Sequence, residues 1–155
     1  MAVSYWLVKS EPASFSFEDL KKSKDQTTYW DGVRNYQARN YLRSMKQGDK
    51  VLFYYSNADP LAVYGVCEVV KEAYPDFTAF DSEDKHYDPK SKDDNPTWYM
   101  VDLKFSKEFK NPVTVDLMKE NKMLKDMQLL KRGNRLSVMP VTKEEFDTIV
   151  VMGRK

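Results

Sequence analysis

The amino-acid sequence predicts an α+β domain built on a curved, mixed β-sheet or small barrel of about five or six strands. The chain has 155 residues, of which 41% are hydrophobic, so it is long enough and apolar enough to bury a real core. Short apolar runs of β type occur in turn with segments of helical periodicity. Neither an internal repeat nor a linker interrupts this order, and we therefore expect a single domain over residues 1–155.

Local patterns place eleven segments along the chain. In order, these are a strand at 5–8, a short helix at 16–20, an extended segment at 27–30, a helix at 35–45, strands at 51–56 and 62–70, a long loop at 81–95, a strand at 98–105, one or two short helices within 112–130, a strand at 136–141, and a C-terminal helix from 142.

The helices are predicted from their N-terminal residues. Ser16 followed by Asp19 resembles a capping box, and Asn35 is a favourable N-cap for the next helix. Thr142 and Glu145 form a full capping box at the start of the last helix. Side chains that cap a helix define where it begins, so these three starts are well determined by sequence.

The strands are predicted from apolar content and turn signals. The runs at 51–56 and 62–70 read as a hairpin, in which Gly65 marks a bulge or a close approach of two backbones. Cys67 is expected to be a small buried hydrophobe, and Trp6 and Trp98 are expected in the core.

Composition excludes several classes of protein. With 25 basic and 24 acidic residues, the net charge of +1 argues against non-specific coating of long nucleic acid and favours a local basic contact. One cysteine permits no intrachain disulfide, and no apolar run approaches the roughly 20 residues that cross a bilayer. The start, Met1 to Ser4, resembles no signal peptide. We expect a soluble cytoplasmic protein, or a nuclear one if the source is a eukaryote.

The common catalytic motifs are absent from the sequence. It contains no glycine-rich phosphate loop and no nucleophile elbow. The one histidine, His86, lies in a charged loop and is expected to be solvated, as are Asp81, Glu83 and Asp84. We therefore expect no metal, no cofactor and no catalytic residues.

The most informative stretch is Trp30-Asp31-Gly32-Val33-Arg34-Asn35. A large flat ring beside polar groups suits a pocket for a planar ligand, in which Trp30 stacks and neighbours such as Asp31 read the edge. The alternative is that Trp30 fills the core at a strand end. Arg34, Arg39, Arg43 and Lys46 form either a phosphate-binding strip or an ordinary solvated helix face.

Several linked motifs resemble one known family, the EVE domains. They are Tyr5–Pro12, Trp30–Asn40, Gly48–Ser56, Tyr87–Ser91 and Leu136–Val141, which together cover essentially the whole chain. The resemblance implies a PUA-like fold, a curved mixed β-barrel with flanking helices, similar to the YTH domains that hold a methylated adenine in an aromatic cage. EVE domains are implicated in recognising modified cytosines in DNA, with modified RNA as a second possibility.

The resemblance also implies roles for individual residues. Trp30 matches the cage ring, Ser10 and Asn35 are candidates for reading the base edge, and Tyr55 and Ser56 lie on the pocket wall. The loop at Tyr74, Pro75 and Asp76 closes the opposite side, and Tyr74, Phe77 and Phe80 compete for the place of a second ring. The family commonly has histidine where this chain has Tyr55. Phosphates would be held by Lys9, Arg34, Arg39 and Lys90.

The sequence thus predicts a monomeric, non-catalytic module that binds DNA or RNA carrying a modified base, most of all a modified cytosine flipped into an aromatic pocket. The alternative is an enzyme that acts on a modified nucleoside or nucleotide, with Asp31 as acid or base. A third possibility is an adaptor for a small molecule or a protein. At this stage, Trp30→Ala is expected to reduce binding and to leave the fold intact.

Overall fold

A computed structural model describes residues 3–154 and confirms an α+β fold, in which a six-stranded mixed sheet is flanked by helices. The strands are β1 (Tyr5–Ser10), β2 (Thr27–Tyr29), β3 (Lys50–Tyr55), β4 (Ala62–Pro75), β5 (Tyr99–Thr114) and β6 (Val138–Val141). The helices are α1 (Phe17–Lys22), α2 (Tyr36–Ser44), α3 (Val115–Lys119) and α4 (Lys143–Arg154), with 3₁₀ turns η1 (Lys24–Gln26), η2 (Phe77–Phe80), η3 (Lys122–Leu124) and η4 (Gln128–Leu130).

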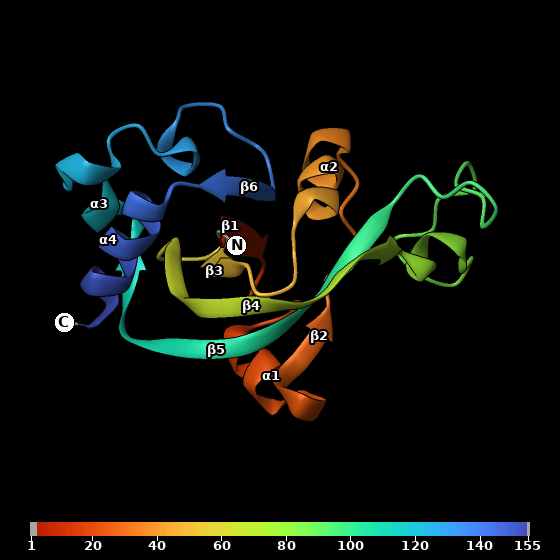
Figure 1. Ribbon diagram of the computed structural model, residues 1–155, viewed down its shortest axis with the longest axis horizontal. Coiled ribbons are helices and arrows are strands. Elements are labelled where there is room, and N and C mark those ends of the chain that lie inside the picture. The colour runs from red at the N-terminus through yellow and green to blue at the C-terminus, as the bar shows by residue number, and fades with distance from the viewer. Residues whose placement is uncertain (1–2, 155) are drawn as a thin grey trace.

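The strand order in the sheet is β2-β5-β4-β3-β1-β6. β1 pairs in parallel with β3 and antiparallel with β6, whereas the other neighbours are antiparallel. Figure 1 shows the sheet curving around the interior, with α3 and α4 at one end and the segment between β4 and β5 at the other. None of the described helices is long and apolar enough to cross a membrane.

The curved sheet has a hydrophobic core on each face. Because successive strand residues point to opposite faces, Trp6 and Val8 of β1 join one cluster and Leu7 joins the other. The first cluster includes Trp30 and residues of α1 and α2, and the second includes residues of α3 and α4. Cys67, Trp6 and Trp98 are buried, as expected. Burial also raises the pKa of the Cys67 thiol, which keeps it protonated.

The predicted helix caps are confirmed. Ser16 forms a reciprocal capping box with Asp19, and the Asn35 side-chain oxygen accepts from the Ala38 N–H at 2.9 Å. Thr142 and Glu145 bond to each other's backbone N–H groups at 3.1 and 3.0 Å. Each of these side chains satisfies N–H groups that have no partner inside the helix, which is why local sequence located them.

The longest strands extend beyond their predicted ends. β4 continues to Pro75 and β5 to Thr114, and register shifts along the pair let both strands bend. One shift lies at Gly65, where an added Cβ would meet the Lys107 carbonyl oxygen and the Phe17 ring. The expected helices within 112–130 are reduced to α3 and single 3₁₀ turns, because Pro112 still belongs to β5.

Candidate functional site

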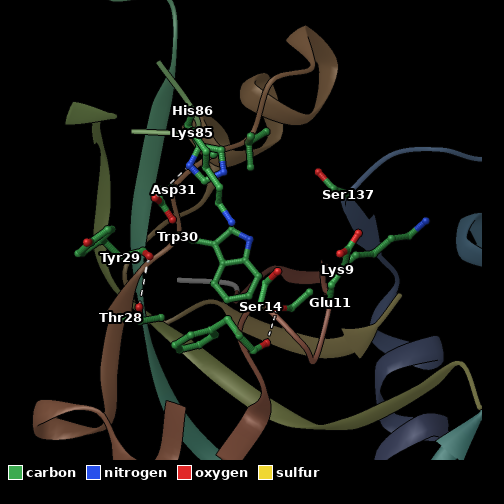
Figure 2. Close-up of a pocket in the computed structure, with 14 residues that line it drawn as sticks. Lys9, Glu11, Ser14, Thr28, Tyr29, Trp30, Asp31, Lys85, His86 and Ser137 are labelled. Carbon is green, nitrogen blue, oxygen red and sulfur yellow. Dashed lines mark hydrogen bonds and ion pairs between the residues drawn. The ribbon is translucent and has the colours of Figure 1, made fainter. Parts of the chain in front are cut away.

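A cavity of about 740 Å³ opens beside Trp30. Its lining comes from four separate parts of the chain, namely residues 9–15, residues 28–33, the pair Lys85 and His86, and Ser137. Figure 2 shows Trp30 in the middle, with Asp31 and His86 on one side and Lys9, Glu11 and Ser137 across from them. The volume falls within the range of small-molecule sites in proteins.

Trp30 is both a core residue and a pocket wall. It follows β2, and its N–H donates to the Val101 carbonyl of β5 at 2.7 Å. Its ring meets Phe53 and Phe15 edge-on, at centroid distances of 5.5 and 6.3 Å, and only 8% of the residue is exposed. Trp30 therefore fills the core and also lines the cavity, while its stacking on a ligand stays a prediction. The burial of Trp30 argues against the expectation that Trp30→Ala leaves the fold intact, since removing a buried tryptophan typically costs about 3–5 kcal/mol.

Asp31 brings a carboxylate into the partly dry wall beside Trp30. Burial raises the pKa of the Asp31 carboxyl, and the nearby His86 acts in the opposite direction without cancelling that effect. Asp31 Oδ2 lies 3.5 Å from His86 Nδ1. A carboxylate held in such surroundings is a strong hydrogen-bond acceptor for a ligand that brings its own donor.

His86 closes one side of the cavity, so the prediction of a solvated histidine is wrong. Its ring packs on Gly32, where an added Cβ would lie 2.5 Å from Nε2. Gly32 also has a φ of +80°, a backbone conformation that favours glycine. The glycine therefore provides both the turn after Trp30 and the space that the imidazole occupies.

Three potential metal ligands meet at this corner, namely Asp31, Asp84 and His86, with donor atoms within 4.8 Å of one another. His86 Nδ1 is buried and lies 3.2 Å from Asp84 Oδ1, yet the angles give it no hydrogen bond. The two carboxylates form ion pairs with the imidazole when it is protonated. The donor set at this corner is of a kind that can bind a small cation.

A buried ion pair holds the His86 loop against the pocket. Asp76 accepts from the Gly32 N–H at 2.8 Å and from Arg34 Nη1 at 3.0 Å. Arg34 Nη2 in turn donates to the His86 carbonyl at 2.6 Å. Burial by itself raises the pKa of Asp76, but hydrogen bonds from Thr78, Gly32 and Arg34 outweigh it and hold that pKa below its usual range. We call this arrangement the Arg34–Asp76 clamp.

Four of the predicted site residues line the cavity, namely Lys9, Ser10, Trp30 and Asp31. The Ser10 hydroxyl donates to the Phe15 carbonyl at 2.6 Å, which fixes the loop that forms the floor of the pocket. Burial lowers the pKa of Lys9, whose Nζ lies 5.9 Å from the centre of the Tyr54 ring.

The other predicted residues lie outside the cavity lining, and most have other contacts. The Tyr55 hydroxyl accepts from the Phe17 N–H at 2.9 Å, and its ring stacks on Tyr64. Pro75 ends β4 instead of lying in a loop. The remaining residues outside the lining are Arg34, Asn35, Arg39, Ser56, Asp76 and Lys90.

Arg34, Asn35 and Asp76 are already bonded within the fold, as clamp and helix cap. Besides Trp30, the phenyl and phenol rings in the lining belong to Phe15 and Tyr29, whereas Tyr74, Phe77 and Phe80 do not line the cavity.

The other ten lining residues are not among the predicted site residues, and they include Phe15, Lys85, His86 and Ser137. Lys85 and His86 arrive from a loop more than fifty positions after Trp30, so no local pattern links them to it. One signal was available for Ser137, because it lies within the Leu136–Val141 motif.

Comparison with known proteins places this geometry in a family. The family model described as the EVE domain matches residues 4–152. Thymocyte nuclear protein 1 of Homo sapiens is 46% identical over 98% of this chain and 75% of its own length. The crystal structure of the human THYN1 protein in complex with DNA containing 5-methylcytosine superposes with a TM-score of 0.93, at 46% identity, and covers 98% of each chain. A hypothetical protein from Leishmania major superposes with a TM-score of 0.92, also at 46% identity, and covers 98% of this chain and 95% of its own. The chain belongs to the EVE domain family.

Proposed function

We propose that this protein binds DNA that carries a modified cytosine, and that the base enters the cavity beside Trp30 without being chemically changed. The observation that carries the proposal is an open cavity lined by a rigid indole and a desolvated carboxylate. It is supported by the human relative, whose crystal structure contains DNA with 5-methylcytosine. The name thymocyte nuclear protein, borne by that relative, accords with a role on DNA.

Trp30 would provide the stacking surface. Two rings packed edge-on against it hold its plane, so little side-chain entropy remains to be lost when a base binds. Stacking of one base on an aromatic side chain contributes about 1–3 kcal/mol. A methyl group buried against the apolar wall adds about 0.8 kcal/mol, which alone is a preference of only several-fold.

Asp31 would identify the base as cytosine. Carboxylates accept from the exocyclic amine of cytosine, whereas thymine offers a carbonyl oxygen at the corresponding position. Because Asp31 is partly desolvated, a base without that donor would leave the carboxylate without this partner and lose affinity. Lys9 and Lys85 line the cavity and would hold adjacent phosphates.

The test compares a short oligonucleotide carrying one 5-methylcytosine with its unmodified form, for the parent and for Trp30→Leu. The variant is expected to weaken binding of the modified oligonucleotide about 5- to 150-fold, the range that corresponds to the loss of one stacked base. Trp6→Leu is the matched control, because Trp6 is 7% exposed and lies outside the cavity lining. Thermal unfolding of both variants establishes that they are folded at the assay temperature.

Equal affinity of the parent for both oligonucleotides would contradict the proposal. So would an equal loss of binding in the two tryptophan variants, because it would assign the effect to the core instead of the pocket.

A second candidate function is catalysis on a modified nucleoside. The pairing of the Asp31 carboxylate with the His86 imidazole favours it, since both groups serve as general acids and bases. Incubation with modified nucleosides followed by mass spectrometry tests this candidate. Turnover that Asp31→Asn abolishes would support catalysis, and unchanged nucleosides would support binding alone.

A further inference from the structure

The exposed aromatic side chains gather around the candidate pocket. Among the described residues, the large aromatic rings with the greatest exposure are Tyr29, Tyr36, Phe77 and Tyr87. All four lie in the two segments, 29–36 and 77–87, that the Arg34–Asp76 clamp joins. Exposed aliphatic residues such as Leu117, Met123 and Val151 belong to the other end of the molecule, around α3 and α4. Planar ligands are therefore favoured at the pocket end.

Tyr36 is the most exposed of these rings, at 63%, and it is held in place. It stacks on Trp98 with a centroid distance of 5.1 Å and an interplanar angle of 24°. The Trp98 indole N–H donates to the Asp88 carboxylate at 2.6 Å, which fixes the indole on which Tyr36 stacks. A stacking surface that is rigid before binding costs little to order.

An arginine lies near each ring of this aromatic pair. The Arg34 guanidinium lies 5.4 Å from the centre of the Trp98 ring, and that of Arg39 lies 5.1 Å from the centre of the Tyr36 ring. Arg39 also donates to the Thr97 carbonyl at 3.0 Å and to the Asn40 side-chain oxygen. These bonds orient the Arg39 guanidinium beside Tyr36. Neither of the bonded groups is acidic, so the positive charge of Arg39 remains available to a phosphate.

The aromatic pair is connected directly to the pocket. Arg34 bonds to the His86 carbonyl, and the His86 ring lines the cavity. Tyr36 follows Trp30 by six residues, so its backbone lies within about 20 Å of it. A nucleic-acid strand that places one base against Trp30 can therefore extend to Tyr36.

We propose that Tyr36 and Arg39 form a second subsite, which takes the nucleotide next to the flipped base. The neighbouring base packs against the exposed side of the Tyr36 ring, and a phosphate of the same strand pairs with Arg39. This inference rests on the proposed function. The second subsite adds affinity that does not depend on modification of the base, whereas the Trp30 pocket supplies the preference for the modified base.

The test measures binding of oligonucleotides with and without one central 5-methylcytosine. Tyr36→Ala is expected to weaken binding of both about five-fold or more and to leave their affinity ratio unchanged. Tyr36→Phe retains the ring and should bind as the parent does. Met123→Ala is the control, because Met123 is 62% exposed at the other end of the molecule.

Oligonucleotides that lack the base on one side or the other of the 5-methylcytosine complete the test. Removing the correct neighbour is expected to weaken binding to the parent and to have little further effect on Tyr36→Ala, the signature of a direct contact. Unchanged oligonucleotide affinity in Tyr36→Ala would overturn the second subsite, and so would strictly additive losses. A parent that shows no preference for the modified base would instead overturn the proposed function, independently of Tyr36.

Discussion

At the scale of single residues, the role proposed for Asp31 is accompanied by a cost to stability. Burial raises the pKa of its carboxyl above the value of about 3.9 that an unfolded chain has. The folded state therefore binds the Asp31 proton more tightly than the unfolded state does. Stability falls as the pH rises through the interval between the two pKa values, and the ionised carboxylate remains unfavourable at neutral pH.

We predict that Asp31→Asn raises the melting temperature at pH 7, because the amide carries no charge to bury. The gain should shrink as the pH falls toward about 3, where the parent carboxyl is protonated as well. The same variant should lose most of the preference for cytosine over thymine. Thermal unfolding at both pH values, together with oligonucleotide binding, measures the two effects. A variant less stable than the parent at pH 7 would show that the carboxylate supports the fold.

The sequence identified Trp30 and Asp31 because the polar residues that are unusual beside an indole directly follow Trp30 along the chain. It did not identify His86, whose position depends on Gly32 and on the clamp, both far away in sequence. Arg34 and Asp76 were expected to contact the ligand, yet in the structure they bond to each other. A charged residue next to a pocket motif looks the same in sequence whether it faces ligand or protein.

At the scale of elements, the long pair β4 and β5 determines where the His86 loop lies. Figure 1 shows the two strands rising together to the segment that joins them. The predicted strands were too short, because alternation weakens where both faces become exposed near the ends. The Arg34–Asp76 clamp then ties this segment to the residues after β2.

The Arg34–Asp76 clamp should produce a second effect of pH on stability, opposite in sign to the effect of Asp31. Since the pKa of Asp76 is held below that of the unfolded chain, its stabilising effect is present above about pH 4 and is lost as the pH falls through the folded pKa. We predict that Asp76→Asn destabilises the protein at pH 7 by about 1–3 kcal/mol, because charge-assisted bonds to buried donors are lost.

Urea unfolding at pH 7 and pH 3 checks this prediction. The parent should lose more stability between these pH values than Asp76→Asn does, while Asp31→Asn should change the pH dependence in the other direction and serves as the internal control. An unaltered pH dependence in Asp76→Asn would show that the clamp carboxylate does not titrate differently in the folded state.

At the scale of the whole molecule, charge balance limits how the proposed nucleic-acid ligand can be bound. The chain carries 25 basic and 24 acidic residues, so binding cannot rely on a general positive field. The fold class was predictable because apolar strand runs and helix caps are local signals. The parallel pairing of β1 with β3 was not, since it brings together residues some forty-five positions apart.

We predict a shallow dependence of binding on salt. If Lys9, Lys85 and Arg39 contact about three phosphates of a single strand, a plot of log K against log salt should have a slope of roughly −2. Arg39→Gln should reduce the magnitude of that slope by about 0.7. Fluorescence anisotropy over a series of salt concentrations measures both values. A much steeper slope would indicate a basic surface beyond these residues.

The position of β1 between β3 and β6 has a consequence for biosynthesis. Its partner β6 comes from residues 138–141, so β1 leaves the ribosome well before this neighbour has been synthesised. Ser137, on the rim of the cavity, arrives with that final strand. A nascent chain therefore completes the cavity only after β6 has been synthesised. Premature termination before β6 leaves an open edge on β1 that promotes aggregation.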